Sequence, residues 1–426
     1  MEAVCIVQFK VFYRVGVAGE KAVLLDERIT DSYYGICFGA NVACFGRNWI
    51  SQFIKTINKP FFIDPVTYVI QFDVENISKE GELKKSYSKL FSEYGLPVME
   101  TNKQMKPTDF NDDRLTLFIQ KVLDFQKNFT QSASGSQQSL FDYAELLGDP
   151  VPSSSKVPEF LIAPYFLFEN TDDGWYALNL KILAISKQRS DDIPIYGMIC
   201  TNFDTLQKSS EVKKIIEDYS KMDGIILWIS DLNEYRMNRD ELISYLKFIN
   251  QLKNIKCDCI TLYGSYFSML ASKFGLNGIS PGIGISEFKR VRDQPTGGTF
   301  SNKYYIPEAK TMAVEADART FYVDNPSTLC TCVICKGEEI NTIKDIHSFF
   351  EELDSTKAKS HYCMNRYLEL EKIKSLSEGE LQSILDNDIE FCETNIGQVY
   401  KIPFSHLFSW KSAIAKFVSE RDDTSS

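Results

Sequence analysis

The second half of the chain alternates short runs of β-branched and aromatic residues with longer amphipathic stretches. The apolar run "DGIILWIS" (223–230) precedes "RDELISYLKFINQLKN" (239–254), whose apolar residues recur with helical spacing. The run "IPIYGMIC" (193–200) likewise precedes "TLQKSSEVKKIIEDYSK" (205–221). The short runs are typical of fully buried strands, and the longer stretches are typical of helices that pack on one face. Their alternation predicts a parallel sheet covered by helices on both sides.

The same alternation extends to the N-terminal part of the chain. Strand-like runs occur at "VCIVQFKVFY" (4–13), "YGICFGANVACF" (34–45) and "PFFIDPVTYVIQF" (60–72). So many strand–helix units favour a (β/α)8 barrel over an open doubly wound sheet. No G-x-G-x-x-G pattern follows the first strand, which argues against a dinucleotide-binding fold. We therefore expect an α/β protein built on a (β/α)8 barrel.

Residues 75–155 interrupt this rhythm. They combine a charged run, the helical pattern "DRLTLFIQKVLDFQKNF" (113–129) and the loop-like "QSASGSQQS" (131–139). This composition predicts helices joined by mobile loops. We expect a barrel over residues 1–325 that contains this helical insertion, followed by a C-terminal segment at 326–426.

Composition narrows the compartment and the partners. The 426 residues carry a net charge of −11, which argues against a broad basic surface but allows a local basic groove. The 11 cysteines, with no visible export signal, indicate a reducing environment, so we expect a cytoplasmic protein. The longest apolar run, "FLIAPYFLF" (160–168), is too short to span a bilayer, and no membrane partner is expected.

Three thiols gather near the start of the C-terminal segment. They form a C-x-C-x-x-C motif at Cys330, Cys332 and Cys335. This spacing can place three sulfurs around one ion such as Zn²⁺, and a closed tetrahedral site needs a fourth protein ligand. Three residues further along the chain are candidates: His347, His361 and Cys363. The motif predicts a structural zinc site and leaves the fourth ligand open.

A histidine 26 residues after the last of these cysteines makes the chain resemble the tRNA-guanine transglycosylase family. In that family Cys330, Cys332, Cys335 and His361 would be the four zinc ligands. The resemblance implies a zinc-bearing (β/α)8 barrel whose metal site follows the last barrel strand. The stretch "LYGSYFSMLASKFGLNGIS" (262–280) is similar to the divergent bacterial and phage branch that inserts 7-deazaguanine into DNA. The implied activity is a pentosyltransferase reaction that replaces guanine in DNA or tRNA.

The resemblance assigns Asp64, which ends the run "PFFI", to the handling of the base proton. Base exchange passes through an oxocarbenium-like transition state and needs a second group at C1′. The nucleophilic aspartate of the family falls at about Ser280, and a serine there would need a neighbouring base. Either another carboxylate has taken the role, or the chain binds its substrate without exchanging the base. Three carboxylates are candidates: Glu287, Asp231 and Glu234.

Substrate contacts are expected at the strand ends and in one basic stretch. The stretch "EFKRVRDQPTGGTFSNKYY" (287–305) combines cations, glycines and aromatics that suit phosphate contact and base stacking. Within it, Arg290 and Arg292 are candidates for phosphate contact, and Tyr304 and Tyr305 for stacking. Five further residues are expected around a flat base pocket: Tyr165, Trp228, Tyr263, Gly264 and Ser280.

Two function classes follow. The first is an enzyme that exchanges guanine for a 7-deazaguanine base in nucleic acid, with DNA favoured over tRNA and Zn²⁺ as a structural cofactor. The second is a binding subunit of the same fold, whose partners would be nucleic acid, a partner protein or a second copy in a homodimer. The two differ in whether a pair of carboxylates converges within roughly 5–9 Å across one pocket. A zinc-stapled barrel that acts on another nucleobase-like ligand is a third alternative.

Overall fold

Eight strands form one parallel sheet that closes almost completely into a barrel. The computed structural model describes residues 8–16, 19–96, 104–131, 155–189, 192–255, 257–284, 287–292, 303–336 and 342–425. The strand order is β3-β2-β1-β10-β9-β8-β7-β6. The two outer strands, β3 and β6, lie side by side, and just before β6 the Glu159 amide donates to the Phe61 carbonyl at 2.8 Å. The strand bounds are β1 Lys10–Arg14, β2 Gly35–Gly39, β3 Phe61–Asp64, β6 Leu161–Ile162, β7 Ile195–Thr201, β8 Gly224–Ile229, β9 Asp258–Leu262 and β10 Gly278–Ser280. The predicted barrel is confirmed.

Aromatic packing explains how the barrel holds together at this seam. The rings of Phe62 on β3 and Phe160 before β6 stack with centroids 4.8 Å apart. Phe160 also stacks on Tyr196 of β7 at 4.1 Å, and Phe12 of β1 contacts Phe62 edge-on at 5.0 Å. Aromatic pairs of this kind add about 0.5–1.5 kcal/mol each beyond the area that they bury. Side chains therefore join the strands where the backbone ladder is interrupted.

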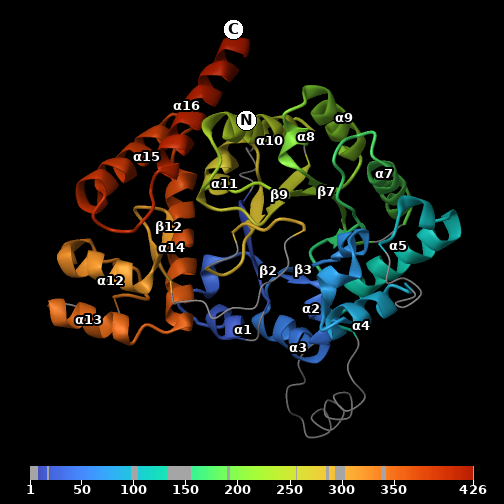
Figure 1. Cartoon of the computed structure of the whole chain (residues 1–426), viewed down its shortest axis with the longest axis horizontal. Helices are drawn as coiled ribbons and strands as arrows, with labels where there is room; N and C mark the ends of the chain where they lie inside the picture. Colours follow the sequence, from blue (N-terminus) through green and yellow to red (C-terminus); the bar gives the residue numbers. More distant parts are fainter. Residues whose placement is uncertain are drawn as a thin grey trace, which may run out of the picture.

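Helices cover the outside of the barrel (Figure 1). Their bounds are α1 Gly19–Leu24, α2 Ala40–Phe45, α3 Arg47–Ile57, α7 Gly174–Lys187, α8 Phe203–Leu206, α9 Ser209–Tyr219, α10 Arg239–Lys253 and α11 Tyr266–Leu270. The predicted insertion lies between β3 and β6. Its described elements are the hairpin β4 Ser78–Lys79 and β5 Glu82–Leu83, with α4 Lys85–Glu93 and α5 Asp112–Lys127. Most of the predicted loop at 131–139 lies outside the described residues.

The eighth helix of the barrel comes from the C-terminal segment. Five further elements precede or follow it in the chain: β11 Lys303–Ile306, β12 Thr311–Val314, α12 Glu315–Asp324, α13 Ile343–Glu351 and α15 Glu380–Phe391. Helix α14 (Ser355–Ser375) packs against α1 and α11, which places it between β10 and β1. Figure 1 shows it between the barrel and the outer helices α12 and α13. The last helix, α16 (His406–Ser425), packs on α15 and α10. The C-terminal segment is thus part of the barrel wall.

A buried histidine connects α16 to the hairpin between β11 and β12. The His406 ring packs against Tyr235 and Trp410 with centroids 4.9 and 4.5 Å away. Its Nε2–H donates to the Ala309 carbonyl at 3.0 Å. Burial lowers the pKa of His406 to about 4, because the imidazolium form would lose its hydration. The folded protein therefore holds this ring neutral at pH values where an unfolded chain binds a proton.

We expect the free energy of unfolding to fall as the pH drops from about 6.5 toward 4, because only the unfolded chain takes up the His406 proton in this range. Between pH 7.5 and 5.5 this group alone should remove on the order of 1 kcal/mol. His406→Gln keeps a donor for Ala309 and should lack this component in urea titrations at the two pH values. His347→Gln, which changes an exposed histidine, is the control, and its unfolding free energy should change between the two pH values as that of the parent does. Identical pH dependence in His406→Gln and the parent would contradict this assignment.

Candidate functional site

Asp64 ends β3 at the C-terminal mouth of the barrel, where barrels of this kind bind their ligands. Its side chain is buried and three groups hold it. The Arg14 guanidinium, at the end of β1, lies 3.1 Å from Oδ2. The Tyr165 hydroxyl donates to Oδ1 at 2.7 Å, and the Val66 amide donates to the same oxygen at 3.1 Å. An ion pair and two hydrogen bonds suit a carboxylate anion that is fixed in one orientation.

Backbone strain is concentrated beside this carboxylate. Val66 has a φ of 55° and Tyr263 a φ of 72°, in the left-handed region that non-glycine residues rarely adopt. The hydrogen bond to Asp64 holds Val66, and the Tyr263 amide donates to the Ser280 carbonyl at 2.9 Å. Strain of this kind costs about 1–3 kcal/mol per residue and tends to occur at functional sites. The strained backbone therefore indicates a functional site at the mouth, independently of the charged groups there.

A thiol and a hydroxyl complete the polar floor of the mouth. Arg14 also contacts the Cys37 sulfur at 3.4 Å. Burial raises the pKa of the Cys37 thiol to about 12, so it is protonated near neutral pH and is a poor nucleophile. Ser280 ends β10 and is fully buried near Cys37. Its hydroxyl faces the protonated Cys37 thiol, and within the described part of the chain no base contacts it that would activate it.

Four buried aromatic side chains, which we call the aromatic group, stand above this floor: Tyr68, Tyr165, Trp228 and Tyr263. Tyr68 stacks on Tyr165 with centroids 5.9 Å apart and meets Trp228 edge-on at 4.9 Å. Trp228 lies 5.5 Å from Tyr263, whose ring also faces the Arg14 guanidinium at 4.9 Å. The structure therefore brings the predicted residues Tyr165, Trp228 and Tyr263 together with Asp64.

Residues 287–292, which we call the mouth segment, run across the aromatic group. The Gly264 amide donates to the Glu287 carbonyl at 2.9 Å, and the Trp228 indole N–H donates to the Lys289 carbonyl at 3.0 Å. Gly264 has a φ of 94°, which favours glycine at this close approach. The Lys289 ammonium lies 3.2 Å from the Tyr68 hydroxyl and 5.8 Å from the centre of the Trp228 ring. A ligand that stacks on these rings must displace Lys289.

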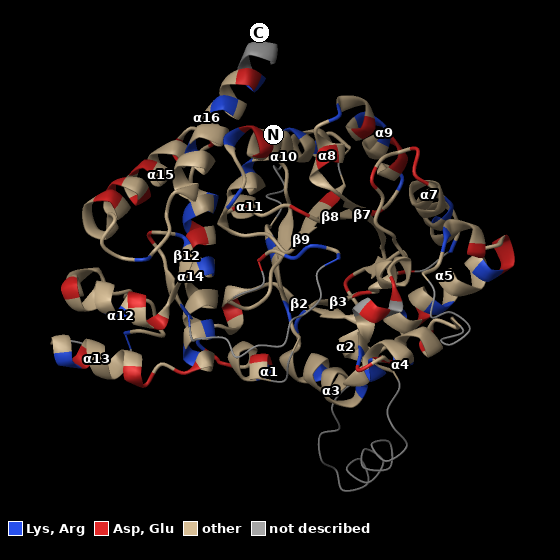
Figure 2. Ribbon diagram, viewed as in Figure 1, with Lys and Arg blue, Asp and Glu red and all other residues tan. Residues whose placement is uncertain are grey.

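The mouth segment is locally basic in a chain of net charge −11. Figure 2 shows basic residues on the segment beside β9, whereas the outer helices carry both acidic and basic residues. Arg290 is exposed, and Arg292 pairs with Glu169 at 3.2 Å near the surface. Both predicted arginines thus lie at the rim of the mouth, where they can reach a phosphate.

The structure does not place Glu287 beside Asp64. Its carboxylate accepts hydrogen bonds of 2.6 Å from Tyr235 and from Tyr362, and it pairs with Arg366. Arg366 and Tyr362 belong to α14, and the whole cluster is nearly inaccessible to solvent. With both oxygens occupied, Glu287 anchors the mouth segment to α14.

The other two candidate carboxylates cap helices. Asp231 is exposed and accepts a hydrogen bond of 2.7 Å from the Phe203 amide, the first residue of α8. Glu234 is buried and accepts hydrogen bonds from the amides and hydroxyls of Ser265 and Ser268 at the start of α11. Neither shares a hydrogen-bond partner with Asp64. The described residues therefore supply one buried carboxylate to the floor of the mouth.

The three cysteines of the C-x-C-x-x-C motif gather with a histidine of α14, and the group could hold a metal ion. Their ligand atoms lie within 4.8 Å of one another: Cys330, Cys332, Cys335 and His361. The Cys332 and Cys335 sulfurs are 3.6 Å apart, and His361 Nδ1 lies 3.5 and 3.2 Å from them. The other two proposed ligands do not belong to the group, because His347 is exposed on α13 and Cys363 is buried elsewhere on α14.

Hydrogen bonds around His361 orient its ring for an ion. Nε2 lies 2.8 Å from the Tyr305 carbonyl, which can only accept, so the proton is on Nε2 and Nδ1 faces the sulfurs. The Tyr304 ring stacks on the imidazole at 4.1 Å. Both tyrosines are fully buried, Tyr304 against His361 and Tyr305 against Glu369 of α14, so neither belongs to the aromatic group at the mouth where a base was expected to stack. They pack around the metal-binding group because the β11 strand runs beside α14.

Sequence reasoning missed three residues of the mouth, Arg14, Cys37 and Tyr68, whereas Lys289 belongs to the basic stretch in which phosphate contacts were expected. Arg14 carried a usable signal, because a cation directly after four strand residues falls at the C-terminal end of a barrel strand. Tyr68 lies four residues after Asp64 in the turn η2 (Thr67–Gln71), a spacing that is informative only once this turn is known.

Comparison with known proteins adds no relative. A scan against protein-family models and a search of curated proteins both find no match to this chain. Among the described residues, no helix has both the length and the apolar composition that a bilayer crossing requires. The geometry itself defines the chain as a nearly closed, parallel eight-stranded barrel with a Cys3His cluster that could hold a metal ion.

Proposed function

We propose that the chain is a pentosyltransferase that exchanges guanine for a 7-deazaguanine base in nucleic acid. The observation that carries this proposal is the buried Asp64, which Arg14 and Tyr165 fix beside the aromatic group. C1′ chemistry needs a negative charge under the sugar and flat surfaces for the base. DNA is favoured over tRNA because residues 262–280 are similar to the DNA-modifying branch of the transglycosylases.

The surroundings of Asp64 favour a role at the sugar over a role as proton donor. A carboxylate paired with Arg14 can stabilise the positive charge that develops at C1′ or attack it. Burial raises the pKa of Tyr165 well above its ordinary value, so its hydroxyl remains a donor that keeps Asp64 in position. The incoming base would replace Lys289 against Tyr68 and Trp228.

Zinc is the ion that best fits the cysteine–histidine cluster. Zn–S bonds of about 2.3 Å and a Zn–N bond of about 2.0 Å at tetrahedral angles place two sulfurs roughly 3.7 Å apart, and a sulfur and a nitrogen roughly 3.5 Å apart. The distances among Cys332, Cys335 and His361, 3.6 Å between the two sulfurs and 3.2–3.5 Å to the imidazole, are close to these values, and the Cys330 sulfur completes a group that spans at most 4.8 Å. Four protein ligands leave no open coordination position, so the ion would be structural. It would connect the cysteine segment 330–335 to α14.

A second candidate function is a binding subunit that recognises nucleic acid, or a partner protein, without exchanging the base. The specific support is that Ser280 replaces the family aspartate and that Glu287 and Asp231 are engaged away from Asp64. Such a chain would keep the aromatic group and the basic mouth segment. It would lack a second acid or base for the departing guanine.

One incubation separates the two candidates. The purified chain is mixed with labelled guanine or a labelled 7-deazaguanine precursor, in parallel with DNA and with tRNA. We expect time-dependent incorporation of label into DNA, because the mouth combines a fixed carboxylate with a base-stacking surface. Binding of DNA without any incorporation, at protein concentrations that saturate the DNA, would favour the binding subunit. Incorporation into tRNA alone would keep the reaction and overturn the preference for DNA.

A further inference from the structure

A cavity of about 410 Å³ opens beside the end of the mouth segment, and Arg292 of that segment lines it. Its base is a pair of hydrogen bonds between the Gln71 side chain and the backbone of Leu167, of 2.8 and 2.6 Å. Gln71 closes the turn that contains Tyr68, and Leu167 follows Tyr165 by two residues. Two segments therefore connect the cavity to the aromatic group: Gln71 lies three residues after Tyr68, and Leu167 lies two residues after Tyr165. The volume of the cavity is typical of a small-ligand site.

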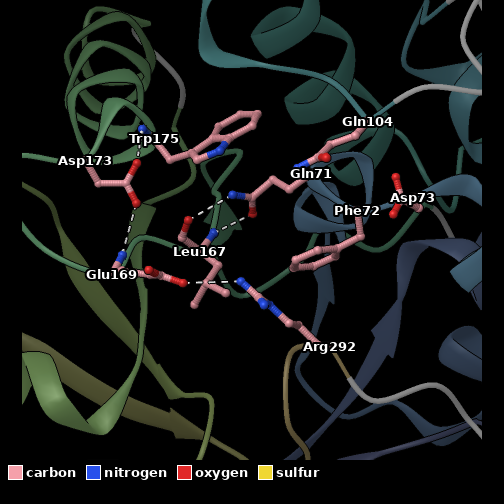
Figure 3. A pocket seen from close by; sticks show the side chains of 9 residues that line it. All are labelled: Gln71, Phe72, Asp73, Gln104, Leu167, Glu169, Asp173, Trp175 and Arg292. Atoms are coloured by element: carbon pink, nitrogen blue, oxygen red, sulfur yellow. Dashed lines mark hydrogen bonds and ion pairs between the residues drawn. The ribbon is translucent and has the colours of Figure 1, made fainter.

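Two half-buried aromatic rings line this cavity. Figure 3 shows Trp175 on one side of the Gln71–Leu167 pair, with Phe72 and Arg292 on the other. The Trp175 ring is held at a tilt against Phe166, with centroids 4.5 Å apart. The Arg292 guanidinium lies over the Phe72 ring at 5.6 Å and, among the described residues, pairs with the exposed Glu169. Such a surface pair is weak, so Arg292 can turn toward a ligand anion at little cost.

Two polar side chains at the cavity have unused hydrogen-bonding capacity. Within the parts of the chain that the structure describes, the Asp73 carboxylate and the Gln104 amide make no hydrogen bond. Both line the cavity, at the end where Phe72 lies. An exposed carboxylate accepts from N–H donors, such as the exocyclic amines of cytosine, adenine and guanine. Thymine and uracil offer no such amine.

We propose that this cavity holds a nucleotide that flanks the nucleotide bound at the mouth. The base would stack on Trp175, its amine would bond to Asp73, and its phosphate would pair with Arg292. An indole face, a carboxylate acceptor and a guanidinium match the three chemical parts of one nucleotide. The placement at the mouth rests on the proposed function, but binding of a nucleotide to the cavity does not depend on catalysis.

Equilibrium dialysis of the full chain with labelled mononucleotides tests the site directly. We expect the monophosphates of deoxycytidine, deoxyadenosine and deoxyguanosine to bind several-fold more tightly than that of thymidine. Trp175→Leu should weaken all four by roughly tenfold, because it removes the stacking surface. Asp73→Ala should abolish the preference for amine-bearing bases. Arg292→Gln should reduce the affinity for deoxycytidine monophosphate to that for the nucleoside. Trp49→Leu, at a half-buried tryptophan of α3, is the matched control and should bind like the parent.

The outcomes separate this inference from the proposed function. Asp64→Asn should bind nucleotides normally even though it cannot exchange a base. Trp175→Leu should raise the KM for a DNA strand in the exchange reaction and leave kcat unchanged. Parent protein that binds nucleotides through Trp175 but exchanges no base would support the cavity and overturn the enzyme. Absence of saturable binding to the parent, or equal binding by Trp175→Leu, would overturn the cavity proposal whatever the activity.

Discussion

Asp64→Asn should abolish base exchange, lowering kcat by at least about a thousandfold, while nucleic-acid binding is retained. The substitution keeps the shape of the side chain and removes the negative charge that would meet the developing cation at C1′. It also leaves the Arg14 guanidinium without its ion pair 3.1 Å away, which opposes positive charge on the sugar still further. Single-turnover incorporation of labelled base into DNA measures the effect directly.

Two other carboxylates provide controls for this substitution. Asp231→Asn makes the same chemical change at the rim, where the side chain is exposed and caps α8, and should retain exchange within a few-fold. Glu287→Gln should lower the free energy of unfolding, because Arg366 loses a buried partner, and should retain a measurable rate. Normal turnover by Asp64→Asn would end the catalytic assignment. Loss of exchange in Asp231→Asn or in a folded Glu287→Gln would move the catalytic role to that residue.

The barrel could be predicted because its strands are buried on both faces. The sequences of strands such as β7 and β8 are continuous apolar runs. In α10, which follows β8, apolar residues recur with helical spacing. The eighth helix could not be assigned in the same way. Helix α14 buries polar residues, among them His361, Asn365, Arg366 and Glu369, so the apolar residues on its buried side are interrupted between Met364 and Leu370. Its place in the barrel follows from tertiary contacts alone.

In the candidate site, too, the sequence could place some residues and not others. Asp64 could be found because a carboxylate that ends an apolar run falls at a strand end. Glu287 is one of the three carboxylates that the sequence offers for the same pocket. The structure instead pairs it with Arg366, a residue far away in the sequence whose position depends on α14. Local patterns report which residues end a strand but not which distant side chain neutralises a charge.

Among the changes proposed for this protein, removal of zinc should lower the free energy of unfolding the most. We expect one tightly held zinc ion per chain and expect Cys332→Ala to lose it, because a closed four-ligand site cannot bind with comparable strength through three ligands. In small zinc-finger peptides metal binding contributes apparent free energies of about 10–16 kcal/mol. Loss of even part of such a contribution would exceed the roughly 5–15 kcal/mol net stability of a typical domain. Elemental analysis and thermal unfolding measure both consequences.

Cys363→Ala is the matched control, because it removes a fully buried thiol from the same helix two residues beyond His361 without touching the cluster. It should keep stoichiometric zinc and lose only the small packing contribution of one sulfur. In Cys332→Ala the disturbance should reach the mouth, because α14 carries both His361 and the Arg366 that holds Glu287. Hydrogen exchange of the Gly264 amide, which donates to the Glu287 carbonyl, should then accelerate in Cys332→Ala but not in Cys363→Ala. Purified parent protein without zinc, or a Cys332→Ala variant as stable as the parent, would contradict a structural metal. Unchanged exchange at Gly264 in a zinc-free variant would show that the mouth segment is held independently of the metal.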